Sequence, residues 1–455
     1  MSQTAPSPPV IFPQLHATEG DGPSSSPPTG AHQHIIVIGG GFAGIQTVLG
    51  LQRAAARVTL VDRRNFTLFQ PLLYQVATGL LSPANIATPM RLLFAGQPHV
   101  QVVLGEVTGI ELSARRVLVD GAAMDFDYLV VACGSRHHYF GNPQWERHAP
   151  GLKSLEDAED IRRRIFLALE RASRTADPLE RERFLTFVVV GGGPTSVELA
   201  GAVAEIVAHA ARSGLRPMIT DSYHIILVEA ASRLLGGFSL ASSEESARAL
   251  RSIGVEVRLQ CRVIDVDETG VMLADDGGKY RISAATVLWG AGLQASPIAT
   301  MLASVTGCTV ARDGRIPVTD DCSIVGHPRV FALGDMASFI HNGKPLPGTA
   351  QVAMQQGDHV AAVISARMSN HMQSMPFRFR DRGNMATIGR RLAVADIGRL
   401  HLRGRIAWLT WLILHLAKLI RFENRLLVLI QWAWSYATWN RNASLITGED
   451  PDRLP

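Results

Sequence analysis

Two glycine-rich segments carry the residue types that bind the phosphates of a dinucleotide. The first contains Gly39, Gly41 and Gly44 in the pattern G-x-G-x-x-G. In such a turn the first glycine allows a tight bend, the second lets a pyrophosphate approach the backbone, and the third lets the next helix pack closely. Asp62 stands 23 residues after Gly39, where its carboxylate would accept a hydrogen bond from a ribose hydroxyl. This spacing predicts a dinucleotide-binding site.

The second segment repeats the first at an offset of 152 residues. It contains Gly191 and Gly193, but Ser196 replaces the third glycine of the pattern. The matching acid is Glu229, 38 residues after Gly191, so an extra loop is expected around 210–223. A carboxylate at this position repels a 2′-phosphate and accepts from a 2′-hydroxyl. The second site is therefore expected to prefer NADH over NADPH.

The elements around these residues are those of a parallel sheet. The β-branched run 35–38 and the segment 58–62 are expected strands, joined by a helix over 45–53. The second repeat is expected to form strands at 187–190 and 225–228 in the same way. Alternating buried strands and helices predict an α/β fold with two Rossmann-like units.

Other segments complete the two units. Strands are expected at 128–135 and 286–292, one closing each repeat. A further strand runs into Gly334 and Asp335, where the carboxylate could hold the ribityl chain of a flavin. The stretches 100–111 and 116–127 alternate between apolar and polar residues, which predicts a small antiparallel insert turning at Gly109 and Gly121. Two dinucleotide sites imply a bound flavin and a diffusing nicotinamide.

Composition excludes several classes of protein. The chain has 455 residues, 47% of them hydrophobic, which is enough for two to four domains with large cores. A net charge of +4 is too small to indicate a nucleic-acid binder. The four cysteines form no CxxC or CxxxxC pair, so no metal site, disulfide framework or local dithiol is expected. The Pro- and Ser-rich residues 1–33 are expected to form a disordered tail and not a targeting signal.

The C-terminal part of the chain is basic and rich in tryptophan. Residues 401–446 hold five of the seven tryptophans and an excess of five positive charges. Their apolar stretches, 406–416 and 426–434, are shorter than the roughly 20 residues that cross a bilayer. Such helices either lie in a membrane interface or pack as a core pair or dimer interface. Both arrangements can hold together, because a dimer could present one continuous membrane-facing patch.

These motifs resemble those of the two-dinucleotide-binding-domain flavoproteins, and within them type II NADH:quinone oxidoreductases. The resemblance extends from about residue 34 to the C-terminus. It departs from the family pattern at four positions. The resemblance is carried by the segments 65–79, 191–201, 350–357 and 384–390. The departures are Ser196, Gly290, Arg382 and Asn384.

The resemblance implies an enzyme that transfers a hydride from NADH to bound FAD, and then two electrons to a quinone such as ubiquinone or menaquinone, without pumping protons. Gln351 and Gln355 lie four residues apart, on one helix face, and their neutral amides would bind a quinone carbonyl. Glu198 would lie near nicotinamide and flavin, with a positioning or proton-handling role. The implied organisation is FAD-binding at 34–150 and 300–380, NADH-binding at 151–299 and membrane-anchoring at 381–455.

The implied location is the cytoplasmic face of the inner or plasma membrane, as a monotopic respiratory-chain protein bound to anionic lipid. A homodimer is expected, and no nucleic acid. Three alternatives remain at this point. A soluble ferredoxin or rubredoxin reductase would not need residues 401–455. A sulfide:quinone oxidoreductase would need two cysteines near the flavin, for which only Cys133 and Cys322 are available. A flavin-binding redox sensor would turn over negligibly.

Overall fold

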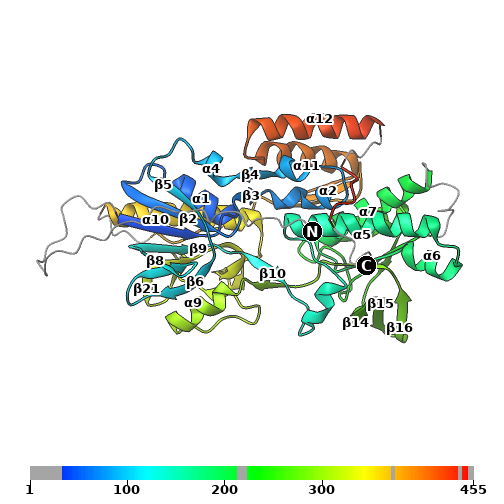
Figure 1. Cartoon of the computed structure of the whole chain (residues 1–455), viewed down its shortest axis with the longest axis horizontal. Helices are drawn as coiled ribbons and strands as arrows, with labels where there is room; N and C mark the ends of the chain where they lie inside the picture. Colours follow the sequence, from blue (N-terminus) through cyan, green and yellow to red (C-terminus); the bar gives the residue numbers. More distant parts are fainter. Residues whose placement is uncertain (1–32, 213–222, 370–374, 439–442, 449–455) are drawn as a thin grey trace, which may run out of the picture. The chain divides into compact units, whose positions relative to one another are not determined.

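The computed structural model describes residues 33–212, 223–369, 375–438 and 443–448. The expected tail therefore lies outside the described residues apart from Gln33, and so does most of the loop expected around 210–223. Helices and strands alternate along the chain in the order expected of an α/β protein (Figure 1).

A six-stranded sheet carries the first glycine-rich turn. Its order is β20-β21-β9-β1-β2-β5, and every neighbouring pair is parallel except β20 with β21. Helices α1 and α10 pack against each other and share one apolar core with the sheet. The bounds are β1 Gln33–Ile38, α1 Phe42–Gly50, β2 Ala56–Asp62, β5 Val100–Leu104, β9 Tyr128–Val131, β20 Ser323–Ile324, β21 His327–Ala332 and α10 Ala350–Met368.

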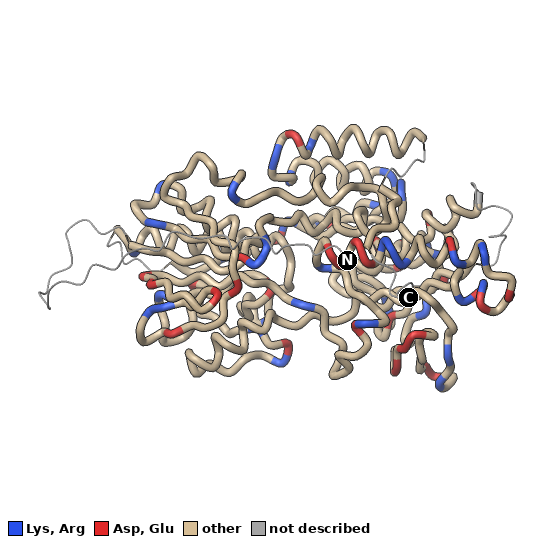
Figure 2. The backbone as a smooth tube through the Cα atoms, in the orientation of Figure 1, with Lys and Arg blue, Asp and Glu red and all other residues tan. Residues whose placement is uncertain are grey.

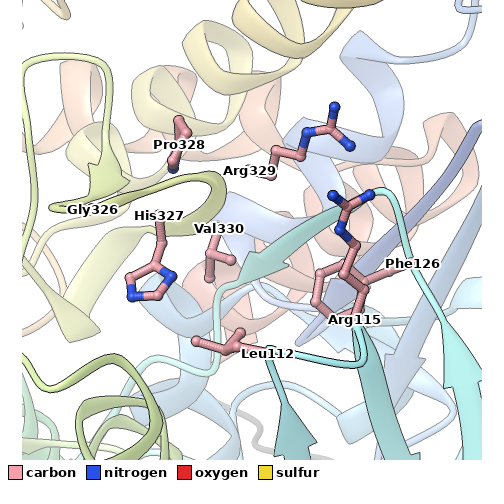
Figure 3. A pocket seen from close by; sticks show the side chains of 8 residues that line it. All are labelled: Leu112, Arg115, Phe126, Gly326, His327, Pro328, Arg329 and Val330. Carbon is pink, nitrogen blue, oxygen red and sulfur yellow. The ribbon is translucent and has the colours of Figure 1, made fainter.

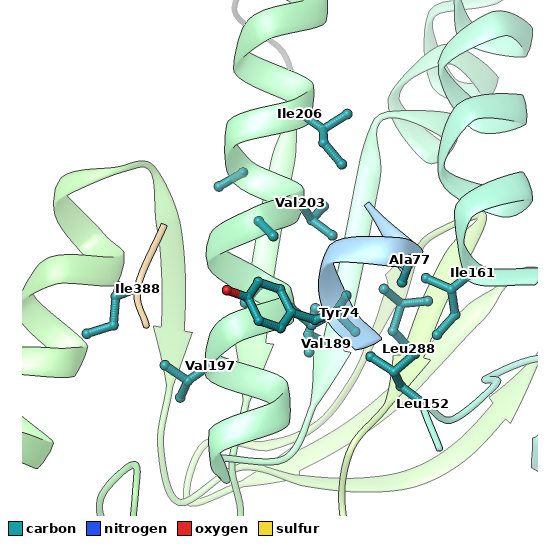
Figure 4. Packing of buried hydrophobic residues seen from close by; sticks show 14 of the residues in the cluster. Tyr74, Ala77, Leu152, Ile161, Val189, Val197, Val203, Ile206, Leu288 and Ile388 are labelled. Carbon is teal, nitrogen blue, oxygen red and sulfur yellow. The ribbon is translucent and has the colours of Figure 1, made fainter. Parts of the chain in front are cut away.

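A four-stranded parallel sheet carries the second turn. Its order is β13-β12-β11-β17, which repeats the order β5-β2-β1-β9 of the first sheet. Apolar side chains from the sheet and from α5, α7 and α8 form one large core, part of which is drawn in Figure 4. The bounds are α5 Leu155–Arg174, β11 Thr186–Val190, α7 Pro194–Arg212, β12 His224–Val228, α8 Leu240–Ser252, β13 Val255–Arg258 and β17 Thr286–Trp289.

The expected antiparallel insert is shorter than the sequence suggested. Residues Val100–Leu104 instead form β5, which pairs in parallel with β2 at the edge of the first sheet. The insert consists of β6, β7 and β8, and Gly121 lies in its turn with a φ of +82°. Gly109 lies inside β6 at an irregularity in the pairing, so the turn expected there was wrong. The bounds are β6 Val107–Glu111, β7 Arg116–Val119 and β8 Ala122–Asp125.

The C-terminal part forms a three-stranded sheet followed by two helices that lie side by side (Figure 1). One face of the helix pair packs on the body of the protein, burying Trp411, Val428 and Trp432 in the core beside α2. Within the part of the chain that the structure describes, no helix has the length and apolar character to cross a membrane. The bounds are α2 Leu73–Ala77, β25 Asn384–Thr387, β26 Ala393–Ile397, β27 Leu400–Arg403, α11 Gly404–Lys418 and α12 Phe422–Thr438.

Shorter elements connect these parts. The helical ones are η1 Gln70–Leu72, α3 Pro83–Ile86, α4 Met90–Leu93, η2 Pro143–Arg147, α6 Pro178–Phe184, α9 Ile298–Thr306 and η3 Gly334–Met336. The strands are β3 Phe66–Leu68, β4 Ala87–Pro89, β10 Ser135–His137, β14 Arg262–Asp267, β15 Gly270–Asp275, β16 Gly278–Ser283, β18 Leu293–Ala295, β19 Ile316–Pro317, β22 Ala337–Ser338, β23 Ile340–His341 and β24 Lys344–Pro345.

Candidate active site

The first glycine-rich turn has the shape that a pyrophosphate needs. Gly39 has a φ of +103°, and a Cβ there would lie 2.5 Å from the carbonyl oxygen of Ala132. A Cβ on Gly44 would lie 1.8 Å from the carbonyl oxygen of Gly39, so α1 approaches the turn as closely as backbone allows. A Cβ on Gly41 would meet no atom within 4 Å, which leaves this backbone open at the start of α1. The turn therefore fits the phosphates of a bound FAD.

Asp62 lies at the end of β2, beside this turn. One carboxylate oxygen accepts a hydrogen bond from the backbone N–H of Gly40 at 2.6 Å. The other oxygen accepts from the backbone N–H of Arg64 at 2.7 Å. These two bonds fix the carboxylate at the strand end, where an adenosine ribose would lie in the expected binding mode.

The second turn repeats this arrangement around Glu229. Gly191 has a φ of +109°, and a Cβ on Gly193 would meet no atom within 4 Å. One carboxylate oxygen of Glu229 accepts from the backbone N–H of Ala231 at 2.6 Å. The other lies 2.7 Å from where a Cβ of Gly192 would stand. Each turn thus has its own acid, held in the same place by the backbone two residues further on.

Two departures from the family pattern lie against each other in this second turn. Ser196 is fully buried in α7, and its hydroxyl donates to the carbonyl oxygen of Val190 at 3.3 Å. A Cβ on Gly290, at the end of β17, would lie only 2.1 Å from the Ser196 Oγ. The missing side chain at Gly290 therefore provides the space that the extra hydroxyl of Ser196 occupies.

Asp335 follows β21 and lies in a polar cluster that joins distant parts of the chain. It accepts from the Ser135 hydroxyl at 2.7 Å and forms an ion pair with Lys153 at 3.2 Å. Lys153 also donates to Ser135, so the three side chains contact one another. Neither Ser135 nor Lys153 was predicted as a site residue, because neither belongs to a glycine motif. Gly334 has a φ of +67° and its N–H donates to Gln356, a buried residue that was also not predicted.

Gln351 and Gln355 share a face of α10 and both bond the same neighbouring segment. Gln355 donates to the carbonyl oxygen of Arg380 at 2.9 Å and accepts from its N–H at the same distance. Gln351 accepts from the N–H of Arg382 at 3.0 Å and donates to the carbonyl oxygen of Gly383 at 3.3 Å. The amides therefore hold a backbone segment in place, and a quinone carbonyl would have to compete with these bonds.

Glu198 lies in α7, two residues after Ser196, and faces β25. It keeps some exposed surface, but dense packing around its carboxyl raises the pKa to about 8. The backbone N–H of Thr387 donates to this carboxyl at 3.3 Å and opposes that rise in pKa. A carboxyl with a pKa near 8 is largely protonated at neutral pH and can exchange a proton under physiological conditions.

The cysteines lack the properties of a redox pair. All four are free thiols. Burial raises the pKa of the Cys133 thiol to about 12 and raises that of Cys322 as well. Thiolates are the nucleophilic form, so these two thiols are poor candidates for attack on sulfide or disulfide sulfur. Cys322 lies at a bend before β20 with a φ of +68°.

The described part of the chain also contains two surface cavities away from the predicted site residues. One, of about 280 Å³, is shown in Figure 3 and is bounded by the β6–β7 and β20–β21 connections. The other, of about 370 Å³, lies between residues 83–89 and the start of α12 and is lined by Asn65, Arg421 and Asn424 among others. Neither cavity is lined by residues of the two glycine turns, by Asp62 or by Glu229. The two turns therefore define the candidate site.

Comparison with known proteins identifies the family. Residues 33–357 match the family model described as pyridine nucleotide-disulphide oxidoreductase. The chain is 39% identical over 434 residues to the type II NADH:quinone oxidoreductase Ndh of Mycobacterium tuberculosis, covering 94% of this chain and 92% of that one. It is 31% identical to the type II NADH:quinone oxidoreductase of Staphylococcus aureus, covering 78% of this chain and 87% of the relative.

Solved structures share the fold. NDH2 from Plasmodium falciparum in complex with NADH superposes with a TM-score of 0.83 at 19% identity, covering 91% of this chain and 99% of that one. The sulfide:quinone oxidoreductase of Aquifex aeolicus gives a TM-score of 0.68 at 17% identity, covering 91% and 92%. The duplicated turns and the extent of these matches lead to one conclusion: the chain belongs to the type II NADH:quinone oxidoreductases, within the pyridine nucleotide-disulphide oxidoreductase family.

Proposed function

We propose that this protein oxidises NADH and reduces a membrane quinone by way of bound FAD. The observation that carries this proposal is the duplicated turn, because each copy has an open glycine backbone and its own backbone-held acid. Bound FAD would supply the chemistry, accepting a hydride and passing two electrons to the quinone. The names of the curated relatives state the same pair of substrates.

The two turns divide the binding of the two dinucleotides. Gly39, Gly41, Gly44 and Asp62 would bind the adenosine diphosphate part of FAD, and Gly334 with Asp335 would bind its ribityl chain. Gly191, Gly193, Ser196 and Glu229 would bind NADH. Glu229 supports NADH over NADPH, because its carboxylate would face a 2′-phosphate of the same charge.

Glu198 would act at the meeting point of these two halves. Its carboxyl can hold or release a proton near neutral pH, which suits a group beside the reacting rings. Gln351 and Gln355 would act on the quinone side. Their bonds to residues 380–383 support a role in placing this segment beside the quinone. A direct bond to a quinone carbonyl would have to replace one of these bonds.

The exposed face of α11 and α12 supports binding to a lipid surface. Its large apolar side chains remain in solvent although the opposite face is buried, and Arg403, Arg405 and Lys418 are exposed beside it. Figure 2 shows that α12 carries its charges only near its start. Basic residues beside an apolar helix face favour an anionic membrane surface. The exposed apolar residues are Ile406, Leu409, Ile413, Leu414, Phe422, Leu426, Leu427, Leu429, Ile430 and Trp434.

This face leads to a proposal for location and assembly. A basic helix pair is attracted to the anionic cytoplasmic leaflet, so we place the protein as a peripheral protein on that side. Ubiquinone or menaquinone in the bilayer would then reach the protein from the lipid side. A homodimer would place two such faces on one membrane and is part of the proposal.

Steady-state oxidation of NADH with a short-chain quinone tests the function. We expect FAD-dependent turnover with NADH and much slower turnover with NADPH. The control replaces the quinone with ferredoxin or rubredoxin, which should accept electrons poorly. Flavin that is bleached by NADH but not reoxidised by any quinone would refute the proposal and favour a redox sensor.

A further inference from the structure

A buried chain of hydrogen bonds runs from α12 to the carboxyl of Glu198. The indole N–H of Trp432 donates to the side-chain oxygen of Gln75 at 2.7 Å. The amide of Gln75 donates to the hydroxyl oxygen of Tyr74 at 2.9 Å, and that hydroxyl lies 3.0 Å from the hydroxyl of Thr387. The backbone N–H of Thr387 then donates to Glu198 at 3.3 Å.

The four side chains that lead to Glu198 are all buried, so water cannot readily replace a lost partner among them. The exposed fractions are 1% for Trp432, 1% for Gln75, 8% for Tyr74 and 2% for Thr387. Figure 4 shows the ring of Tyr74 lying across α7, with its hydroxyl on the side nearest Ile388, which follows Thr387. A buried donor or acceptor without a partner is costly, and each member therefore restrains the next.

The groups themselves determine the direction of the first two bonds, because an indole N–H and an amide N–H can only donate. The hydroxyls of Tyr74 and Thr387 share one hydrogen bond, in which either can be the donor. An indole and an amide do not pass protons along such a chain, so it cannot work as a proton wire. Its physical effect is to fix the end of β25, where the N–H that contacts Glu198 is located.

We infer that Tyr74 and Gln75 are positioning residues that hold Thr387 against Glu198, with Trp432 of α12 as their anchor. The inference rests on the proposed role of Glu198 in the reaction. If the restraint is released, the Thr387 N–H moves away from the carboxyl. The ionised form of Glu198 then loses this hydrogen-bond donor, and the pKa of Glu198 rises further.

The surroundings of Glu198 leave few other causes for such a change. Among the described residues, burial and the Thr387 N–H account for the shifted pKa of Glu198, and none of their charged side chains contributes. The titratable groups packed nearby are Tyr74 from α2 and Tyr436 from α12, and burial raises the pKa of Tyr74 well above its ordinary value. Further along α7, Glu205 accepts from the backbone N–H of Arg390.

The test measures flavin reduction by NADH in the holoenzyme from pH 6 to 10 by stopped flow. We expect the wild-type rate to follow an ionisation that Glu198→Gln removes. Tyr74→Phe and Thr387→Val should shift this ionisation upward by about one pH unit, because a hydrogen bond to the charged form is lost. Trp432→Phe should shift it in the same direction by a smaller amount, since it acts two bonds further away.

Tyr139→Phe is the matched control. Tyr139 is buried and donates to the carbonyl oxygen of Ala149 at 2.9 Å, outside this chain of bonds. It should lower the melting temperature without moving the pH profile. If Tyr74→Phe and Thr387→Val behave like this control while Glu198→Gln removes the ionisation, the bonds are only packing and the inference is wrong. If Glu198→Gln leaves the profile unchanged, the proposed role of Glu198 fails as well.

Discussion

Replacing Gly290 with alanine should destabilise the second glycine-rich turn, chiefly through contact with Ser196. The new Cβ would lie 2.1 Å from the Ser196 Oγ, and 3.3 Å from both the Ser196 Cβ and the carbonyl oxygen of Val190. Ordinary contacts begin near 3.4 Å, and Ser196 is fully buried, so the hydroxyl has no free space to enter. Overpacking of this kind costs about 1–3 kcal/mol of the free energy of unfolding.

A second substitution isolates the contact. Ser196→Gly removes the hydroxyl and its long bond of 3.3 Å to Val190, and costs about 1 kcal/mol because glycine weakens a helix. In the double variant the alanine at position 290 no longer meets a hydroxyl. The two changes should therefore be less damaging together than their sum, by a coupling energy of about 1–3 kcal/mol.

The assay is chemical denaturation of the FAD-saturated protein, with KM for NADH measured in parallel. Gly237→Ala serves as the control, because a Cβ there would meet no atom within 4 Å, and it should change stability by less than about 0.5 kcal/mol. A Gly290→Ala variant as stable as this control, or a double variant whose losses simply add, would show that the two departures are unrelated.

Four further results are expected. Glu229→Gln should raise the NADPH-to-NADH ratio of kcat/KM by about tenfold, or ~1.4 kcal/mol of removed repulsion; an unchanged ratio would place Glu229 away from the ribose. Gln355→Ala should slow quinone reduction about threefold to tenfold but spare flavin reduction by NADH, as measured in separate half-reactions. Ile413→Asp with Phe422→Asp should stop flotation with anionic liposomes without unfolding the protein, because both side chains are exposed. Because the folded-state pKa of Glu198, about 8, lies above its ordinary value, the wild type should lose stability relative to Glu198→Gln as pH rises from about 4.5 to 8 in denaturation curves.

The parts of the site that could be predicted are those whose chemistry is local. Gly39, Gly44 and Asp62 follow one another within a single strand-turn-helix-strand unit, so their roles can be inferred from spacing alone. Lys153 contacts Asp335 across 182 positions of sequence, and Tyr74 contacts Thr387 across 313. No local pattern marks such a partner, because the fold and not the motif brings the two residues together.

The error in the antiparallel insert has a physical cause. Residues Val100–Leu104 are half-buried or exposed at every position, which is common in a strand of a two-faced antiparallel sheet. The same pattern arises at the edge of a parallel sheet, where the outer strand is less covered than the central ones. β1, next to the centre of the same sheet, is buried at nearly every position. The burial pattern of β5 therefore reflects its position at the edge of the sheet and not the direction in which it runs.

The C-terminal helices have one buried face and one exposed apolar face, so core packing leaves a surface that a membrane could still contact. Trp411 and Trp432 lie in the core, as a packed helix pair requires, whereas Phe422 and Ile430 of α12 stay exposed. A truncation near residue 400 would therefore uncover the core and leave Gln75 without its donor, so lost activity would not prove that a membrane contact was lost. Charged substitutions at the exposed positions separate the two effects, because they change the face proposed to bind lipid while the buried anchor of α12 remains in place.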